Sequence, residues 1–89
     1  MVEQVVEIMN QRGLHARAAA KFVHLASGFA ARVTVCTGSD EADGKSILSL
    51  MVLGASRGTG LTLRCEGDDE QAALDALVDL IGGGFDEGS

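Results

Sequence analysis

The segment RGLHARAAAKF, residues 12–22, gathers the side chains in this sequence that are best suited to chemistry on an anion. His15 carries an imidazole, which titrates near neutrality, and the guanidinium of Arg17 follows two residues later. Gly13 precedes the histidine, and glycine permits backbone conformations that let a bound group come close. The pattern predicts an anion site with a nucleophile inside it.

This site is expected at the start of a helix. Apolar residues recur three or four positions apart over residues 16–27, and Gly28 follows as the expected C-terminal stop. If His15 is the N-cap or lies beside it, its ring lies near the free N–H groups of Ala16 and Arg17 and near the positive end of the helix dipole. The dipole disfavours imidazolium by roughly 0.3 to 1 kcal/mol at an exposed terminus, so we expect a neutral ring with a free lone pair.

Phosphoryl transfer is the reaction that suits these groups. A phosphoryl group on a ring nitrogen of His15 would face backbone N–H donors and the Arg17 guanidinium, which makes charge-assisted contacts. Arg17 would therefore act as a clamp and not as a base. The reaction needs mainly positioning and charge compensation, so a shallow site on a small domain is sufficient.

Composition and charge limit the other functions. The 89 residues predict a single domain over residues 1–89, and the formal net charge of −6 argues against nucleic acid as a partner. No acid, cysteine or second histidine stands at ligand spacing from His24, so neither a metal site nor a cofactor is expected. No stretch approaches the roughly 20 apolar residues of a membrane span. We expect a cytoplasmic monomer with no membrane partner.

The periodicity of apolar residues predicts the strands. Alternation of apolar and polar residues favours strands at residues 2–9, 31–37 and 60–67, with a short strand near residues 41–43. Alternation implies a sheet with one face in water, and therefore an antiparallel or mixed sheet. Cys36 and Cys65 fall on these strands and are expected to be buried thiols.

Helical spacing and capping residues complete the order βαββαβα. A second short helix is expected between Ser46 as N-cap and Gly54, and a third from a capping box of Asp68 and Gln71 to the glycines at 82–84. The fold class is α+β, an open-faced two-layer β-sandwich in which three helices cover one face of a four-stranded, mainly antiparallel sheet. Residues 85–89 are expected to form a flexible tail, unless Phe85 tucks back onto the domain.

The apolar residues that follow Ser46 are too numerous for a two-turn helix that covers a sheet with one face. Leu50 and Leu53 are expected in the core. The others predict an exposed apolar patch beside His15, made of Ala20, Ile47, Leu48 and Met51. An alternative is a small non-catalytic regulatory or interaction module in which this patch and the cysteines matter and His15 is an ordinary helix cap.

The run Gly13-Leu14-His15-Ala16-Arg17-Ala18-Ala19 resembles the active-centre motif of the HPr family, the histidine phosphocarriers of the bacterial phosphotransferase system. The length, the element order and a serine that opens the second helix agree with that family over essentially the whole chain. The resemblance implies that His15 accepts a phosphoryl group on its δ1 nitrogen from enzyme I, itself charged by phosphoenolpyruvate. It passes the group to an enzyme IIA protein or domain, as in sugar transport, and is a covalent carrier, not an enzyme.

The same resemblance extends to regulation and to partner docking. In regulated branches of the family the serine equivalent to Ser46 is phosphorylated by an ATP-dependent HPr kinase/phosphorylase, although its role as an N-cap also explains the residue. Ala18 replaces a common proline, and His24 and Ser27 replace lysines that meet enzyme I. The implied partner surface is Ala20, His24, Ile47, Leu48 and Met51. The tail Gly84-Phe85-Asp86-Glu87 is similar to that of NPr, the nitrogen-branch member.

Overall fold

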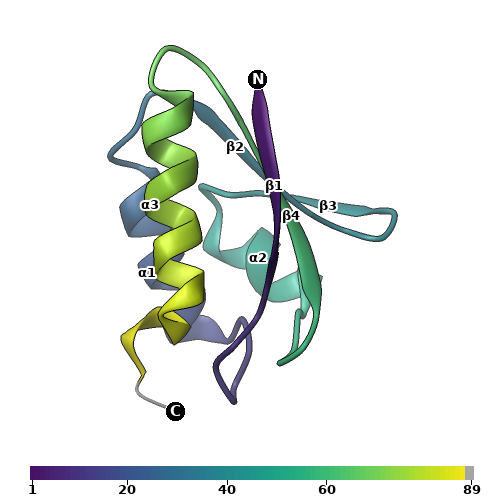
Figure 1. Ribbon diagram of the computed structural model, residues 1–89. Coiled ribbons are helices and arrows are strands. Elements are labelled where there is room, and N and C mark those ends of the chain that lie inside the picture. The colour runs from purple at the N-terminus through teal and green to yellow at the C-terminus, as the bar shows by residue number, and fades with distance from the viewer. Residues whose placement is uncertain (88–89) are drawn as a thin grey trace.

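Four strands form one antiparallel sheet in the computed structural model, which describes residues 1–87 (Figure 1). The strand order is β1-β4-β2-β3, so that β4 and β2 lie in the centre. The register pairs Val6 with Leu61 and Val35 with both Leu63 and Ala42. The strands are Val2–Glu7 (β1), Arg32–Thr37 (β2), Asp40–Asp43 (β3) and Gly60–Glu66 (β4).

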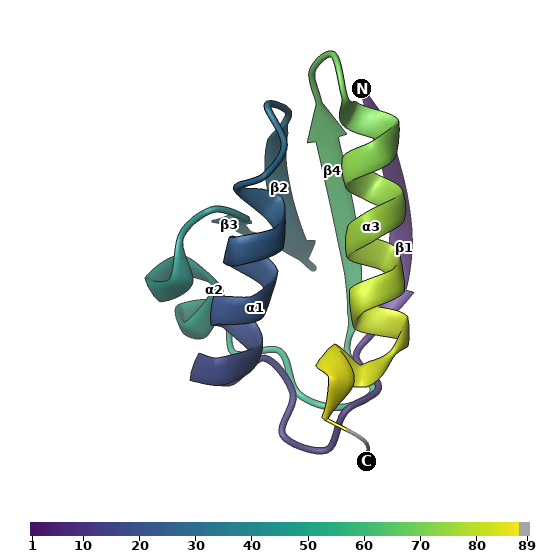
Figure 2. The ribbon, with the colours of Figure 1, turned by 90° about the vertical axis from the view of Figure 1, so that its left-hand side faces the viewer.

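The helices all cover the same face of this sheet. They are Ala16–Ala26 (α1), Ile47–Leu53 (α2) and Glu70–Gly82 (α3), and a 3-10 turn, Gly84–Asp86 (η1), follows. Figure 2 shows α1 and α3 side by side over the strands, with α2 next to α1. The expected order βαββαβα and the open-faced sandwich are confirmed. Within residues 1–87, none of the helices combines the length and the apolar character that a membrane crossing requires.

Side-chain alternation along the central strands decides which face is covered. Val33 and Val35 on β2, and Leu61 and Leu63 on β4, are at most 1% exposed beneath the helices. The residues between them face solvent on the bare side of the sheet. The prediction of two buried thiols is half wrong: Cys65 is buried, and burial raises the pKa of its thiol, but Cys36 lies on the bare face and is half-buried.

The caps that the sequence predicted for α2 are present. The hydroxyl oxygen Oγ of Ser46 accepts the N–H of Ser49 at 3.2 Å, and Gly54 ends the helix with a left-handed φ of 66°. Helix α1 ends at Ala26, with Ser27 as its C-cap. These boundaries depend on neighbours in sequence, which is why a pattern predicts them.

The capping box predicted for α3 is wrong. The N-cap is Asp69, not Asp68, and Asp69 makes no side-chain capping bond to its own helix. Its two carboxylate oxygens instead accept the N–H groups of Ala30 and Ala31, each at 2.8 Å. A carboxylate that binds two backbone donors gains more than one that caps a single N–H, so the contact across the fold replaces the local one.

Of the two alternatives for residues 85–89, a flexible tail is wrong for residues 85–87, and the return of Phe85 onto the domain is confirmed. Residues 88–89 lie outside the described residues. Phe85 is fully buried, and the ammonium of Lys21 donates to its carbonyl oxygen at 2.6 Å. Phe85 and Asp86 adopt left-handed φ angles of 57° and 61°, which is strained for residues other than glycine. Burial of a phenylalanine ring contributes roughly 1.5–3 kcal/mol, and with the added hydrogen bonds it offsets that strain.

Candidate functional site

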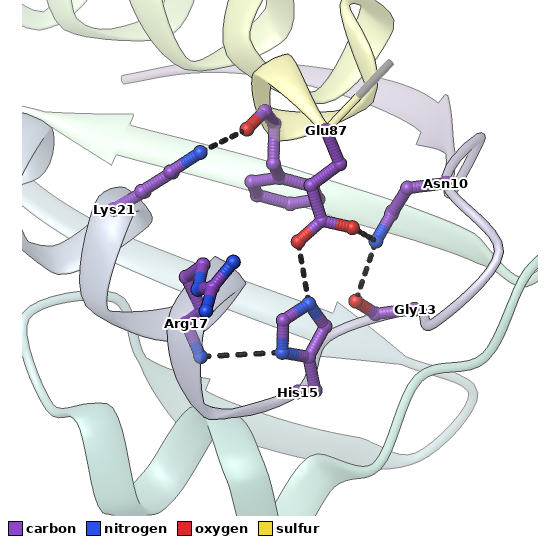
Figure 3. Close-up of polar contacts among 7 residues, drawn as sticks. Asn10, Gly13, His15, Arg17, Lys21 and Glu87 are labelled. Atoms are coloured by element: carbon purple, nitrogen blue, oxygen red, sulfur yellow. Dashed lines mark hydrogen bonds and ion pairs between the residues drawn. The ribbon is translucent and has the colours of Figure 1, made fainter. Parts of the chain in front are cut away.

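His15 is the N-cap of α1, as the sequence predicted. Its backbone is extended, with φ −80° and ψ 179°, and its Nδ1 accepts the N–H of Arg17 at 3.3 Å (Figure 3). Its carbonyl oxygen accepts the first N–H of the helical ladder, from Ala19 at 2.8 Å. The side chain keeps 23% of its surface exposed, so the ring lies at the surface and its position is fixed.

The loop before His15 is held against a second loop. The N–H of Leu14 donates to the carbonyl oxygen of Ala55 at 2.8 Å, and the Leu14 side chain is buried. Gly13 has a left-handed φ of 65°, and a Cβ atom there would lie 2.5 Å from the same Ala55 oxygen. Only glycine fits this close approach, and the approach fixes where the imidazole leaves the backbone.

Glu87 completes the surroundings of the ring, and sequence analysis did not predict this. Its Oε2 lies 2.5 Å from Nε2 of His15, across a separation of 72 residues, and its side chain is only 14% exposed. Asn10, which is 1% exposed, donates from Nδ2 to Oε1 of Glu87 at 3.0 Å and to the Gly13 carbonyl at 2.8 Å. Figure 3 shows Glu87 between the Asn10 amide and the imidazole of His15. The sequence signal for this contact is weak: it consists of Glu87 standing two positions after the aromatic residue Phe85.

The electrostatics assign the two ring nitrogens different roles. The hydrogen bond from Asn10 above all, with smaller contributions from His15 and Lys21, holds the pKa of Glu87 below its usual value against the cost of desolvation. Glu87 is therefore a carboxylate at neutral pH and accepts the proton on Nε2. Because Nδ1 accepts the N–H of Arg17, the neutral ring has its lone pair on Nδ1.

A polar hollow of about 420 Å³ lies beside this ring. Three of the seven basic residues of the protein line it, together with acidic residues from the tail. The lining residues are Gln11, Arg12, Arg17, Lys21, Asp86 and Glu87. Basic side chains thus gather beside the ring, and Arg17 lines the same hollow as Glu87, which contacts His15.

The residues expected to meet partners are exposed, on two helices that contact each other. Ala20 and His24 are exposed on α1, as is Ala16, which was expected to bind the phosphoryl group through its backbone. On α2, the exposed fractions are 41% for Ile47, 72% for Leu48 and 44% for Met51, while Leu50 is fully buried and Leu53 is partly buried against the core. Val52, 78% exposed, was missed. Together the exposed α2 side chains form an apolar patch of Ile47, Leu48, Met51 and Val52.

The functional groups of residues 1–87 do not gather as metal ligands: no three His, Cys, Asp or Glu side chains lie close enough to hold an ion. The groups around His15 are instead hydrogen-bond donors, cations and two carboxylates, of which Glu87 contacts the ring. They suit an anion that arrives and leaves, bound to an open nucleophile.

Comparison with known proteins decides the family. Residues 2–82 match the family model described as the PTS HPr component phosphorylation site. The chain belongs to the HPr family. It is 48% identical over 88 residues to phosphocarrier protein HPr of Neisseria meningitidis serogroup A, and the match covers 99% of both chains. It is 44% identical over 88 residues to phosphocarrier protein NPr of Shewanella violacea, and that match covers 99% of this chain and 97% of the relative.

Solved structures of the family have the same fold. The crystal structure of an HPr from Thermoanaerobacter tengcongensis superposes with a TM-score of 0.94 at 47% identity, covering 98% of each chain. An HPr dimer from the same organism matches with a TM-score of 0.76, also at 47% identity, over 96% of this chain and 98% of that one. The resemblance drawn from the His15 motif is confirmed at the level of family and fold.

Proposed function

We propose that this HPr-family protein carries a phosphoryl group covalently on Nδ1 of His15 in the phosphoenolpyruvate-dependent phosphotransferase system. The observation that carries the proposal is the ring itself, partly exposed at the N-terminus of α1 with its Nδ1 lone pair toward the backbone N–H of Arg17. A neutral imidazole is a nucleophile that needs no separate base, and its Nδ1 lone pair becomes available when the 3.3 Å hydrogen bond from the Arg17 N–H opens.

The surroundings of Nδ1 support the phosphorylated state. The first N–H groups of α1, from Ala16 and Arg17, have no partner one turn earlier, and the helix dipole favours negative charge at this end. Arg17 is the clamp, because a guanidinium binds phosphoryl oxygens with paired, charge-assisted hydrogen bonds. The protein is a carrier and not an enzyme: it takes up one group and returns it, with no other cofactor.

The donor in this proposal is enzyme I and the acceptor is an enzyme IIA protein or domain. Both must reach the same exposed ring, so they dock one after the other. The docking surface is the apolar patch on α2 with Ala20 and His24 on α1, because exposed apolar side chains gathered on one face mark protein contacts. The working species is a cytoplasmic monomer, although a relative has been solved as a dimer.

Ser46 is the second part of the proposal, as a regulatory phosphorylation site for an HPr kinase/phosphorylase. It is half-buried at the N-terminus of α2 and lies directly before the apolar patch. A phosphate there would add about two negative charges beside the docking surface. Incubation with an HPr kinase and ATP should modify wild type but not Ser46→Ala, and should slow transfer from enzyme I. Failure to slow transfer would remove the regulatory role.

The experiment that tests the carrier is phosphorylation by enzyme I and phosphoenolpyruvate, followed by mass spectrometry of the intact protein. We expect an acid-labile, base-stable gain of one phosphoryl group in wild type and none in His15→Ala. His24→Ala, which alters the other histidine of α1, should still take up one group at the end point. No adduct on wild type, or an adduct on His15→Ala, would overturn the proposal.

Arg17→Ala separates the carrier from the alternative of a simple interaction module. In a carrier it slows phosphoryl transfer while the free energy of unfolding is nearly unchanged, because Arg17 is an exposed residue of the first turn. In an interaction module, where His15 only caps the helix, the same change would leave any partner binding intact and no transfer would be measured for either variant.

A further inference from the structure

The contact between Glu87 and His15 brings together residues 72 apart in the sequence at the proposed phosphoryl site, and nothing in the carrier chemistry so far requires it. We propose that Glu87 is a positioning residue for phosphoryl transfer: its carboxylate holds the proton on Nε2, leaves the lone pair on Nδ1, and offsets the positive charge that the ring acquires on phosphorylation. This inference rests on the proposed function of His15.

The charge on the ring follows from the atoms in the step. The lone pair of Nδ1 forms a bond to phosphorus, and the bond between phosphorus and the donor breaks, with its electron pair leaving on the donor. The proton on Nε2 stays, so the ring becomes a cation that carries the phosphoryl group. A carboxylate 2.5 Å from Nε2 stabilises that cation. When the acceptor takes the phosphoryl group, the ring returns to its neutral form with the proton still on Nε2.

The position of Glu87 at the ring also limits its repulsion of the incoming group. It binds Nε2, whereas the phosphoryl group would bind Nδ1 at the other edge of the imidazole. The phosphoryl oxygens are then nearer to the N–H and guanidinium of Arg17 than to the carboxylate. Because Coulomb energies fall with distance, the carboxylate acts mainly on the ring that it touches.

The hydrogen bonds of Asn10 show that the Glu87 carboxylate is held in place. Both hydrogens of the Asn10 amide are used, one on the Gly13 carbonyl and one on Glu87. Its Oδ1 is buried without a hydrogen-bond partner. Rotating the amide would place that oxygen against two acceptors, so the orientation is determined. The Asn10 amide therefore leaves its own oxygen unpaired, while its two N–H groups bind the Gly13 carbonyl and the Glu87 carboxylate.

The backbone before Glu87 is also shaped for this contact. Two consecutive left-handed residues, Phe85 and Asp86, turn the chain back toward α1. The buried ring of Phe85 and the bond from Lys21 to its carbonyl anchor the turn. Strain of this kind persists where the surrounding structure determines it, and it is concentrated at functional sites.

The test uses Glu87→Ala, Glu87→Gln and a charge-matched control, Asp79→Asn, an exposed carboxylate on α3 outside the site. In Glu87→Gln the uncharged amide has one oxygen, which can still accept the Nε2 proton but leaves the N–H of Asn10 without its acceptor. Nitrogen-15 NMR of the imidazole reports which nitrogen is protonated before any phosphorylation. Quenched-flow transfer from phosphorylated enzyme I, at varied concentrations of this protein, separates kcat from KM.

We expect the wild type and Glu87→Gln to protonate Nε2, and Glu87→Ala to show a mixture of the two tautomers. The kcat of transfer should fall about 10- to 100-fold in Glu87→Ala, as when the carboxylate behind a metal-binding histidine is removed, and less in Glu87→Gln, with KM unchanged. Asp79→Asn should match wild type. A wild-type tautomer and a wild-type kcat in Glu87→Ala would overturn the inference, and so would a change in KM alone.

The two proposals fail separately. If wild type takes no phosphoryl group from enzyme I, the carrier function fails, and the NMR measurement still shows whether Glu87 sets the tautomer. If wild type is phosphorylated on His15 and Glu87→Ala transfers at the same rate, only the role of Glu87 fails.

Discussion

Two carboxylates reach across the fold from opposite ends of α3, and they do different work. Asp69, at the N-terminus of the helix, accepts two backbone N–H groups from the loop between α1 and β2. Glu87, just beyond the C-terminus, accepts one amide N–H from Asn10 and meets the imidazole of His15. Hydrogen bonds lower the pKa of both carboxyls, with the bond to Ala30 first for Asp69 and the bond to Asn10 first for Glu87.

The difference lies in what the donors can do. Backbone amides neither titrate nor react, so Asp69 only fixes the path of a loop. An imidazole changes its charge and bonding during phosphoryl transfer, so a carboxylate fixed against it affects chemistry as well as shape. A carboxyl group with a shifted pKa is therefore a candidate for function only when the group that it is hydrogen-bonded to can itself react.

The largest expected effect comes from removing the anchor of Glu87 and leaving Asp69 untouched. Phe85→Ala should lower the free energy of unfolding by about 3–5 kcal/mol, because the ring is fully buried. It should also release the Glu87 carboxylate from His15 and slow transfer. Chemical denaturation and nitrogen-15 NMR of the imidazole measure the two effects. A stability loss with the His15 tautomer unchanged would show that Glu87 needs no anchor.

A smaller effect is expected when the donor to Glu87 is removed. Asn10→Ala leaves the Gly13 carbonyl without its buried donor and should cost about 1–3 kcal/mol of the free energy of unfolding. The Glu87 carboxyl should then titrate closer to the ordinary value of 4.5, because its largest lowering influence is gone. Carbon-13 NMR of the carboxyl group follows that titration. An unshifted titration would show that Asn10 does not hold the carboxylate.

The smallest effect is expected from Asp69→Asn, and it should depend on pH. The pKa of Asp69 is lower in the folded protein than its ordinary 3.8, so its stabilisation is fully present above 3.8 and is lost as the pH falls through the lower folded value. Wild type should therefore be more stable than Asp69→Asn at pH 6, and the difference should shrink in acid. Thermal melts at a series of pH values measure it.

The phosphoryl-transfer rate of Asp69→Asn completes the comparison. It should equal that of wild type, because Asp69 contacts only backbone amides. A slowed transfer in a folded Asp69→Asn would contradict the division between a carboxylate that holds a loop and one that acts on a reactive ring.

The parts of the fold that the sequence predicted are those that depend on neighbouring residues. Alternation along β2 and β4 predicted the covered face, and Ser46 and Gly54 predicted the ends of α2. His15 and Arg17 were predicted because they share one helix start. In each case the signal and the structure span a few residues, so spacing alone carries the information.

The parts that the sequence did not predict depend on residues distant in the chain. The Asp69 carboxylate accepts the N–H of Ala30, 39 residues away, in place of an N–H of its own helix. Glu87 accepts an amide N–H from Asn10, 77 residues away. No local pattern encodes such a choice, since the competing local bonds are equally available. The tail shows the same limit: its acidic residues favoured a free end and left the return of Phe85 onto the domain as an alternative, and only the structure shows that this ring is buried.

The closure of the chain on itself has a consequence for synthesis. His15 is translated 72 residues before Glu87, which lies beyond the end of the family pattern at residue 82. A ribosome-bound chain that has already formed its sheet and helices would still lack the carboxylate behind the imidazole. By the role inferred for Glu87, the phosphoryl site is completed later in synthesis than the helix that carries His15.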